Sequence, residues 1–370
     1  MGADACPPTS SFRRSSLEPV IGAPAPPSSS SSSSPHPLTL LSWNVLADGL
    51  AQSGRWAHCP PEALEWGARQ PGLLAEIDAS GADVLCLQEC NHWDWWKGQL
   101  DARGYAGAFW PKPGSPAGRA GSPPDGCVVA WRKERFTATT VEGRPFDARC
   151  VVAGGLVGPA RALLLPDSTT DEEASPNGGG DCRSPPIITA SGEALPAPTP
   201  PRGVQGSLVV TLNDSHSGRV VVVGCTHLKA KAGEEEDVVR GRQAAEAAAR
   251  VLRAGGEGNA VVILAGDFNA GPGTAAVSAP VACGLTSIWD IGSPWPWTTF
   301  KFRTAGVGLG AASNNTLPGE LKVSKGLVDH VFFRGCALRA RWPALTEPEQ
   351  GLPVDGYPSD HVAVCVRWDV

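Results

Sequence analysis

The stretch VVILAGDFN at residues 261–269 decides the fold of this chain. Its first five residues are apolar and rich in β-branched side chains, which is the composition of a buried strand. Gly266 follows, and then come a carboxylate at Asp267 and a carboxamide at Asn269. Because strand side chains repeat every two residues, both groups are predicted to face the same side of a sheet. A lone Asp at a strand end is also a common turn residue, so this stretch by itself does not indicate a functional site.

Five further segments combine an apolar, strand-like run with polar groups. They are LTLLSWN, ending at Asn44; ADVLCLQE, ending at Glu89; RVVVVGCTH, ending at His227; GLVDHVFF, containing Asp329; and PSDH, with Asp360 and His361 before the strand-like VAVCVRW. Since strand ends in a packed sheet system converge on one edge, these side chains are expected to form one site. Their spread along the chain favours a single domain over two.

Composition limits the class of protein. The formal net charge is −6, so the whole-molecule field repels nucleic acid, and a polyanionic substrate needs a local basic patch or a metal. The 11 cysteines form no CxxC pair and several lie in apolar runs, which indicates reduced thiols in a reducing compartment. No run of about 18 apolar residues is present, so no membrane partner is expected.

Low-complexity sequence precedes and interrupts the expected domain. Residues 1–37 are rich in Pro and Ser and are expected to be disordered, either as an inert tail on a cytoplasmic protein or as a transit peptide to a mitochondrion or plastid. The domain is expected at residues 38–370. Within it, residues 154–203 are expected to be an exposed insertion, because loop closure costs only about 0.6 kcal/mol more per doubling of loop length.

Helical periodicity is present in three stretches. A helix is predicted within residues 59–80, where Pro71 is expected to kink or split it, and another begins in HWDWWKGQL at residues 92–100. A third is predicted at residues 234–256, with four acids in its first turn and two glycines at its end. VQGSLVVTL and RVVVVGCTH are predicted to form an antiparallel hairpin.

The expected site offers mostly oxygen donors, a set that selects a hard cation such as Mg²⁺ or Mn²⁺. Glu89 would be the main ligand, and Asn44 and Asp360 would complete the shell through water, since Mg²⁺ usually keeps several waters.

Acid–base chemistry falls to other residues of the set. His361 carries an imidazole, the side-chain type that titrates near neutrality, and Asp329 would orient it by accepting its second ring N–H. Asn269 and His227 would donate hydrogen bonds to a phosphoryl oxygen as negative charge develops.

At these residues the chain resembles a known family. WNVLA, LCLQE, THLKA, GDFNA and YPSDH resemble the motifs of the endonuclease/exonuclease/phosphatase superfamily, from about residue 38 to 370 apart from the insertion. Within it, FWPKP, PPDGC, WTTFKFRTAG and LTEPEQGLPVDGYPSDH resemble the nocturnin branch, which is related to the carbon-catabolite-repressor-type deadenylases. The resemblance implies a four-layer α/β sandwich, with two β-sheets packed face to face and helices outside.

The resemblance also implies roles for single residues. Glu89 is implied to hold Mg²⁺, and Asp267 and His361 to serve the acid and base steps, with Asp329 paired to His361. Which of Asp267 and His361 activates the water stays open.

Phosphate binding is implied for two further groups of residues. The residues implied to steady the reacting phosphate are Asn44, His227 and Asn269. The residues implied to hold the substrate's other phosphates are Lys112, Arg240 and Arg303. The acidic run at residues 234–237 lengthens the loop before Arg240 and departs from the family pattern.

Two activities follow from the resemblance, and both would use the same catalytic residues. The first is a phosphatase that removes the 2′-phosphate of NADP⁺ and NADPH to give NAD⁺ and NADH. The second is a poly(A)-specific 3′ exoribonuclease, an mRNA deadenylase whose partner is an RNA 3′ end. The net acidic chain without a basic cluster favours the small dinucleotide, bound by a monomer. A non-enzymatic scaffold is disfavoured, because every polar strand end needed for chemistry is present.

Overall fold

The computed structural model describes Arg14 and residues 16–22, 36–56, 58–115, 117, 121–147, 205–304 and 321–370, together with the backbone of 187–189 and 194–195. Most of the expected N-terminal tail and of the expected insertion at 154–203 therefore lies outside the described residues.

The larger of two main sheets has nine described strands, in the order β1-β16-β17-β2-β3-β5-β4-β7-β8. Its strands are β1 (Glu18–Pro19), β2 (Pro37–Asn44), β3 (Val84–Cys90), β4 (Tyr105–Pro111), β5 (Gly126–Arg132), β7 (Ile187–Thr189), β8 (Ala194–Leu195), β16 (Ala337–Arg341) and β17 (Val364–Asp369).

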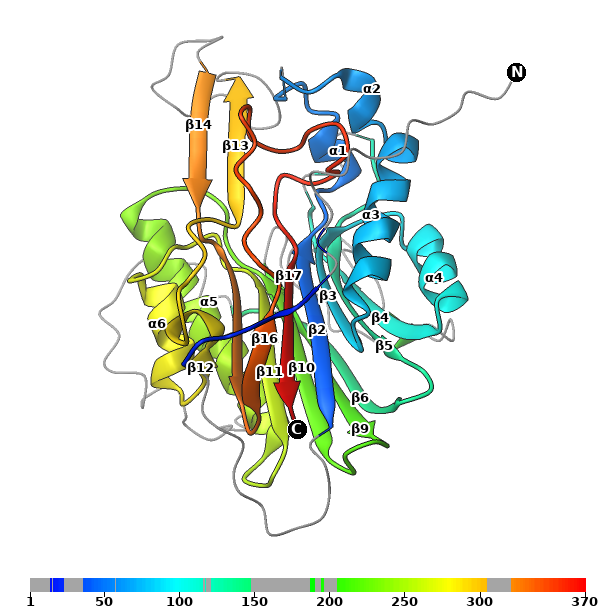
Figure 1. Ribbon diagram of the computed structural model, residues 1–370, viewed down its shortest axis with the longest axis vertical. Helices are drawn as coiled ribbons and strands as arrows, with labels where there is room; N and C mark the ends of the chain where they lie inside the picture. The colour runs from blue at the N-terminus through cyan, green and yellow to red at the C-terminus, as the bar shows by residue number, and fades with distance from the viewer. Residues whose placement is uncertain are drawn as a thin grey trace, which may run out of the picture.

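The second sheet has six described strands, in the order β12-β15-β11-β10-β9-β6. They are β6 (Phe136–Pro145), β9 (Gly206–Asp214), β10 (Val220–His227), β11 (Val261–Asp267), β12 (Thr286–Ser287) and β15 (Asp329–Arg334). Two further strands, β13 (Thr299–Thr304) and β14 (Leu321–Gly326), form a separate two-stranded sheet, an arm that extends beyond the two main sheets (Figure 1).

Helices cover the outer faces of both sheets, which gives the four expected layers. α3 (Trp66–Ser80) and α4 (Trp93–Ala102) lie beside the larger sheet, and α5 (Glu234–Gly255) and α6 (Ala275–Ala282) lie beside the smaller one (Figure 1). The short helices are α1 (Asp48–Ala51), α2 (Pro61–Leu64) and the 3₁₀ turn η5 (Ile288–Asp290). Apolar side chains from both sheets, among them Leu85, Val128, Val223 and Ile263, are fully buried in one core. The predicted sandwich is confirmed.

Parallel pairing sets where the site lies. β2 runs parallel to β3 with Asn44 opposite Gln88, and β10 runs parallel to β11 with His227 opposite Asp267. Parallel neighbours end at the same edge of a sheet, so each sheet presents a pair of polar strand ends there.

Two local predictions within the domain differ from the structure, and part of the expected insertion at 154–203 joins the larger sheet, where β7 pairs antiparallel with β4. The helices at α4 and α5 and the antiparallel β9–β10 hairpin form as expected. Pro71, however, lies inside α3, and the break between α2 and α3 falls at Glu65, whose backbone is extended. Asn269 lies beyond the end of β11 with φ 50°, so the two-residue alternation of the strand does not reach it.

The described cysteines are all free thiols. In the same part of the chain, no helix combines the length and apolar character needed to cross a membrane.

Part of the N-terminal segment is ordered against the domain, which its composition did not predict. β1 pairs antiparallel with β16. Arg14 is 5% exposed, donates a 3.0 Å hydrogen bond to the carbonyl of Ala363 and forms an ion pair with Glu76. Its guanidinium also lies 4.5 Å from the ring centroid of Trp342. These contacts make Arg14 an anchor in the interior.

We expect Arg14→Ala to lower the free energy of unfolding by about 3 kcal/mol or more, because breaking a buried ion pair leaves an uncompensated buried charge. Urea denaturation measures the change. The control is Arg144→Ala, which removes the exposed pair with Glu142 and should cost little. Equal effects of the two substitutions would contradict the anchoring role.

Candidate active site

The structure brings the polar strand ends together at one edge of the sandwich. Asn44 and Glu89 belong to β2 and β3 of the larger sheet, and His227 and Asp267 end β10 and β11 of the smaller one. The loop before β17 adds His361, whose backbone N–H donates to the Ser359 hydroxyl and whose carbonyl accepts from the indole of Trp43. The site is thus built from both sheets.

Asp267 lies at the centre of this group and is 1% exposed. Its Oδ1 accepts a 2.8 Å hydrogen bond from the backbone N–H of Asn269, and its Oδ2 accepts a 3.0 Å bond from the Asn44 amide. Oδ2 also lies 3.6 Å from Nε2 of His361 and 3.7 Å from Nε2 of His227. Burial alone would raise the pKa of Asp267, but the charges of His361 and His227 outweigh it and lower the pKa.

His361 and Asp329 form a hydrogen-bonded pair. Nδ1 of His361 lies 2.8 Å from Oδ2 of Asp329, which is the contact expected from the sequence. Burial alone would lower the pKa of His361, but Asp329, with help from Asp267 and Asp360, raises the pKa to about 9. Burial and the charge of Asp267 raise the pKa of Asp329, against the opposing effect of His361. The carboxylates therefore favour a protonated His361 ring beside an ionised Asp267, whereas the Lys301 ammonium, 2.8 Å from Nε2 of His361, opposes protonation of the ring.

Asn44 and Glu89 lie in contact across the ends of β2 and β3. The Asn44 amide donates to Glu89 Oε1 at 3.1 Å, and Glu89 Oε2 accepts from the backbone N–H of Ala47 at 3.0 Å. Glu89 has φ 54°, a conformation that is uncommon outside glycine and is found most often at functional sites.

The donor set fits a hard divalent cation. Ligand atoms of Asp267, Asp329 and His361 all lie within 4.8 Å of one another. Oδ1 of Asp329 and Oδ1 of Asp360 are buried and have no hydrogen-bond partner among the described residues. Carboxylate and amide oxygens with unused lone pairs suit Mg²⁺ or Mn²⁺. This compact group differs from the ligand set expected from the sequence, of which only Asn44 and Glu89 are in direct contact with each other.

Asp360 instead faces two cations of β13. Its Oδ2 lies 2.6 Å from Nζ of Lys301 and 3.2 Å from Nη2 of Arg303. Burial alone would raise the pKa of Asp360, but Lys301, His361 and Arg303 hold the pKa well below its usual range. Lys301 was not among the site residues predicted from the sequence. Its spacing of two residues from Arg303 was the available signal, because that spacing puts both on one face of a strand.

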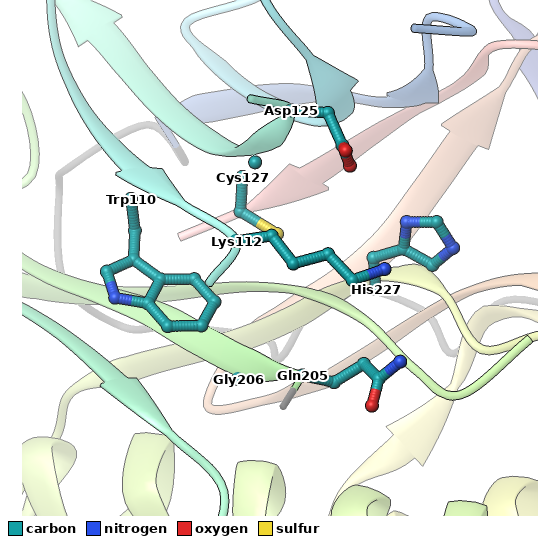
Figure 2. A pocket seen from close by; sticks show the side chains of 8 residues that line it. Trp110, Lys112, Asp125, Cys127, Gln205, Gly206 and His227 are labelled. Carbon is teal, nitrogen blue, oxygen red and sulfur yellow. The ribbon is translucent and has the colours of Figure 1, made fainter. Parts of the chain in front are cut away.

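Lys112 lies in a small pocket beside the site (Figure 2). His227, Asp125, Cys127 and Gln205 also line this pocket, and in Figure 2 the Lys112 side chain extends toward His227. A cation therefore stands next to one of the residues expected to steady the phosphate.

Arg240 and Asn269 are engaged with backbone. The Arg240 guanidinium donates to the carbonyls of Lys229 and Lys231 at 3.0 and 2.6 Å and pairs with Asp237, inside the acidic run noted in the sequence. The Asn269 amide donates to the carbonyl of Leu228 at 3.2 Å. Both side chains hold the loop that follows His227.

Arg69 is a second residue of the site that was not predicted from the sequence. It is 1% exposed, and it donates to the carbonyls of Val45, Leu46 and Pro358 at 2.5, 2.6 and 2.8 Å. Two of these carbonyls follow Asn44 and the third precedes Asp360. One guanidinium therefore joins two loops of the site.

Comparison with known proteins agrees with this geometry. Residues 41–361 match the model of the Endonuclease/Exonuclease/phosphatase family. Nocturnin of Mus musculus is 28% identical over 348 residues, which cover 90% of this chain and 65% of that protein. The chain thus spans slightly less than two thirds of the length of that relative.

Two other similarities cover different shares of the chain. Carbon catabolite repressor protein 4 homolog 2 of Arabidopsis thaliana is 38% identical over 102 residues, which cover 27% of this chain and 17% of that protein. The solved human Nocturnin catalytic domain with bound sulfate anion superimposes with a TM-score of 0.60 at 23% identity, covering 90% of this chain and 93% of that one. At that identity the structural likeness bears on the fold.

We expect Arg69→Lys to loosen both loops of the site, although the substitution keeps the positive charge. A lysine keeps the positive charge, but its point-like ammonium cannot replace a planar fork that reaches three carbonyls. Hydrogen exchange should show faster exchange at residues 44–47 and 358–361, with slower exchange kept in the core strands. Unchanged exchange in both loops would contradict this role.

Stability of the metal-free protein should depend on pH through His361. Its pKa of about 9 in the folded state lies above the ordinary value of 6.5. The stabilisation from proton binding is therefore complete below pH 6.5 and is lost as the pH rises from 6.5 through 9. Urea midpoints measured in EDTA across this window should fall for the wild type and fall less for His361→Gln. Exposed His216 offers the control, since His216→Gln should leave the slope unchanged.

Proposed function

The chain belongs to the endonuclease/exonuclease/phosphatase family of phosphoric ester hydrolases, and we propose that it removes the 2′-phosphate of NADP⁺ and NADPH. The observation that carries this proposal is the position of Lys112 in a small pocket bordered by His227. A dinucleotide presents a few phosphates close together, so a small number of cations near the reacting centre is sufficient to bind it. The motifs that resemble the nocturnin branch support the same substrate.

The substrate cations can be assigned from their contacts. Lys112 lines the pocket, and Arg303 keeps 35% of its side chain exposed while it pairs with Asp360. We assign the binding of the non-reacting phosphates to these two residues. Arg240 is given a different role, in which it holds the loop after His227, because its guanidinium is engaged with the carbonyls of Lys229 and Lys231.

The opposite pKa shifts of Asp267 and His361 support a division of roles in which Asp267 is the base and His361 the acid. Asp267, whose pKa is lowered, is an ionised acceptor that can take the proton of the attacking water. His361, whose pKa is raised, carries a proton that it can donate to a phosphoryl or leaving oxygen, with Asp329 holding its other ring nitrogen. His227 lies beside Asp267 and would donate a hydrogen bond to the phosphate, whereas the Asn44 amide donates to Glu89 and Asp267 and so positions these two carboxylates.

A divalent cation, when bound, supplies electrostatic stabilisation of the developing phosphoryl charge. Among the residues of the site, Glu89 is the carboxylate that the family resemblance implies would hold it. Its two oxygens lie at the end of β2, and the Asn44 amide joins it to Asp267, which belongs to the compact group of possible ligands.

A deadenylase is the second candidate, and one observation favours it. The chain is 38% identical to a carbon catabolite repressor protein 4 homologue, although over only 102 residues. Shortening poly(A) requires contacts to several successive phosphates, which makes binding strongly dependent on salt. The net charge of −6 supports the small substrate over this alternative.

Phosphate release from NADP⁺ and NADPH, compared with shortening of labelled oligo(A), tests the proposal. We expect the protein with MgCl₂ to release phosphate from the dinucleotides and to leave oligo(A) intact, and we expect excess EDTA to stop the reaction. Efficient shortening of oligo(A) without phosphate release from either dinucleotide would replace the phosphatase by the deadenylase.

Lys112→Ala should lower kcat/KM for NADP⁺ by about ten- to a hundredfold, since a charge-assisted contact contributes roughly 1.5 to 3 kcal/mol. The matched control is Lys133→Ala, because Lys133 forms an exposed surface pair with Asp101. Similar kcat/KM values for both variants would exclude Lys112 from substrate binding.

A further inference from the structure

One face of β13 is directed at Asp360. The side chains on this face come from every second residue of the strand, and all three contact Asp360. The Thr299 hydroxyl donates to the Asp360 carbonyl at 2.9 Å, while Lys301 and Arg303 reach its carboxylate. Thr299 also forms an isolated β-bridge with His361, so the strand is fixed against the loop that carries both site residues.

Lys301 is the more enclosed of the two cations. Its side chain is 11% exposed, compared with 35% for Arg303. Its Nζ lies 2.6 Å from Asp360 Oδ2 and 2.8 Å from His361 Nε2. Removing the Lys301 ammonium from water costs free energy. A strong interaction with negative charge has to offset that cost.

That negative charge is provided by the carboxylates of the site. Asp267, Asp329 and Asp360 are each 2% exposed or less, and Glu89 adds a fourth carboxylate nearby. Buried carboxylates are tolerated only when cations or donors compensate them. Arg303 also contacts Asp360, but at 3.2 Å it is farther from the carboxylate than Lys301 and more exposed to solvent. Its attraction to Asp360 is therefore weaker.

We propose that Lys301 is the counter-cation of the metal-free site. Its ammonium neutralises Asp360, so that the acidic cluster remains buried when no metal is bound, and a divalent cation entering the cluster does so against the repulsion of this ammonium. Lys301 is in this sense a positioning residue, which acts through Asp360 and His361. The proposal does not depend on which phosphoester is hydrolysed.

The experiment compares wild type, Lys301→Met and Lys322→Met without any phosphoester present. Methionine keeps the length of the side chain and removes its charge, and Lys322 is an exposed lysine of β14 on the same arm. Thermal unfolding is followed in EDTA, and MgCl₂ binding is measured by calorimetry. For Lys301→Met we expect a melting temperature in EDTA several degrees below wild type, and Mg²⁺ binding roughly tenfold tighter, which corresponds to about 1.4 kcal/mol of relieved repulsion. Lys322→Met should match the wild type in both measurements.

A melting temperature in EDTA equal to that of Lys322→Met, or Mg²⁺ binding no tighter than in the wild type, would overturn the proposal. If Lys301→Met folds only when MgCl₂ is present, the proposal is supported in its strongest form. If it folds in neither condition, the double variant Lys301→Met with Asp360→Asn decides. Recovery of folding in the double variant would show that the uncompensated charge of Asp360 prevented folding of Lys301→Met. Failure to recover would refute the proposal. These outcomes are independent of activity toward NADP⁺, so they stand apart from the test of the proposed function.

Discussion

The edge of the sandwich where the site lies depends on the carboxylate of Asp267. Asn44 of the larger sheet donates to it, the backbone of Asn269 donates to it from the smaller sheet, and two imidazoles stand within 3.7 Å. A buried ionised carboxylate costs several kcal/mol unless donors and positive charge surround it. The strand ends are therefore held in register with one another across two sheets, and this pre-organises the site before any substrate arrives.

The same surplus of negative charge explains the neighbouring features. Burial acts in one direction on every carboxylate, yet the pKa of Asp329 is raised and that of Asp267 is lowered, because the positive charges are unevenly placed. Protons, lysine and arginine side chains and a divalent cation all serve the same electrostatic requirement. An arrangement of this kind suits chemistry that develops charge on a phosphate.

Much of this was predictable from the sequence, for a definite physical reason. Buried strands are strongly patterned, so a polar residue that closes one, such as Asp267 or His227, stands out, and parallel pairing then places such residues at one edge. Lys301 carried only a weak signal, its two-residue spacing from Arg303, and its partner His361 lies far away in the chain. Arg69 carried none, since its partners are carbonyls, which every residue possesses. The helix predicted within residues 59–80 breaks at Glu65 and not at Pro71, because the backbone of Glu65 is extended. Neither periodicity nor composition indicates that break.

The anchoring of Arg14 has a consequence for proteolytic maturation. A leader peptide cut off after residue 22 would take away both β1 and Arg14, and it would leave Glu76 in the interior without its cation. The trimmed protein would then reach its compartment already weakened and more open to degradation. Any cleavage that preserves this anchor has to fall before Arg14.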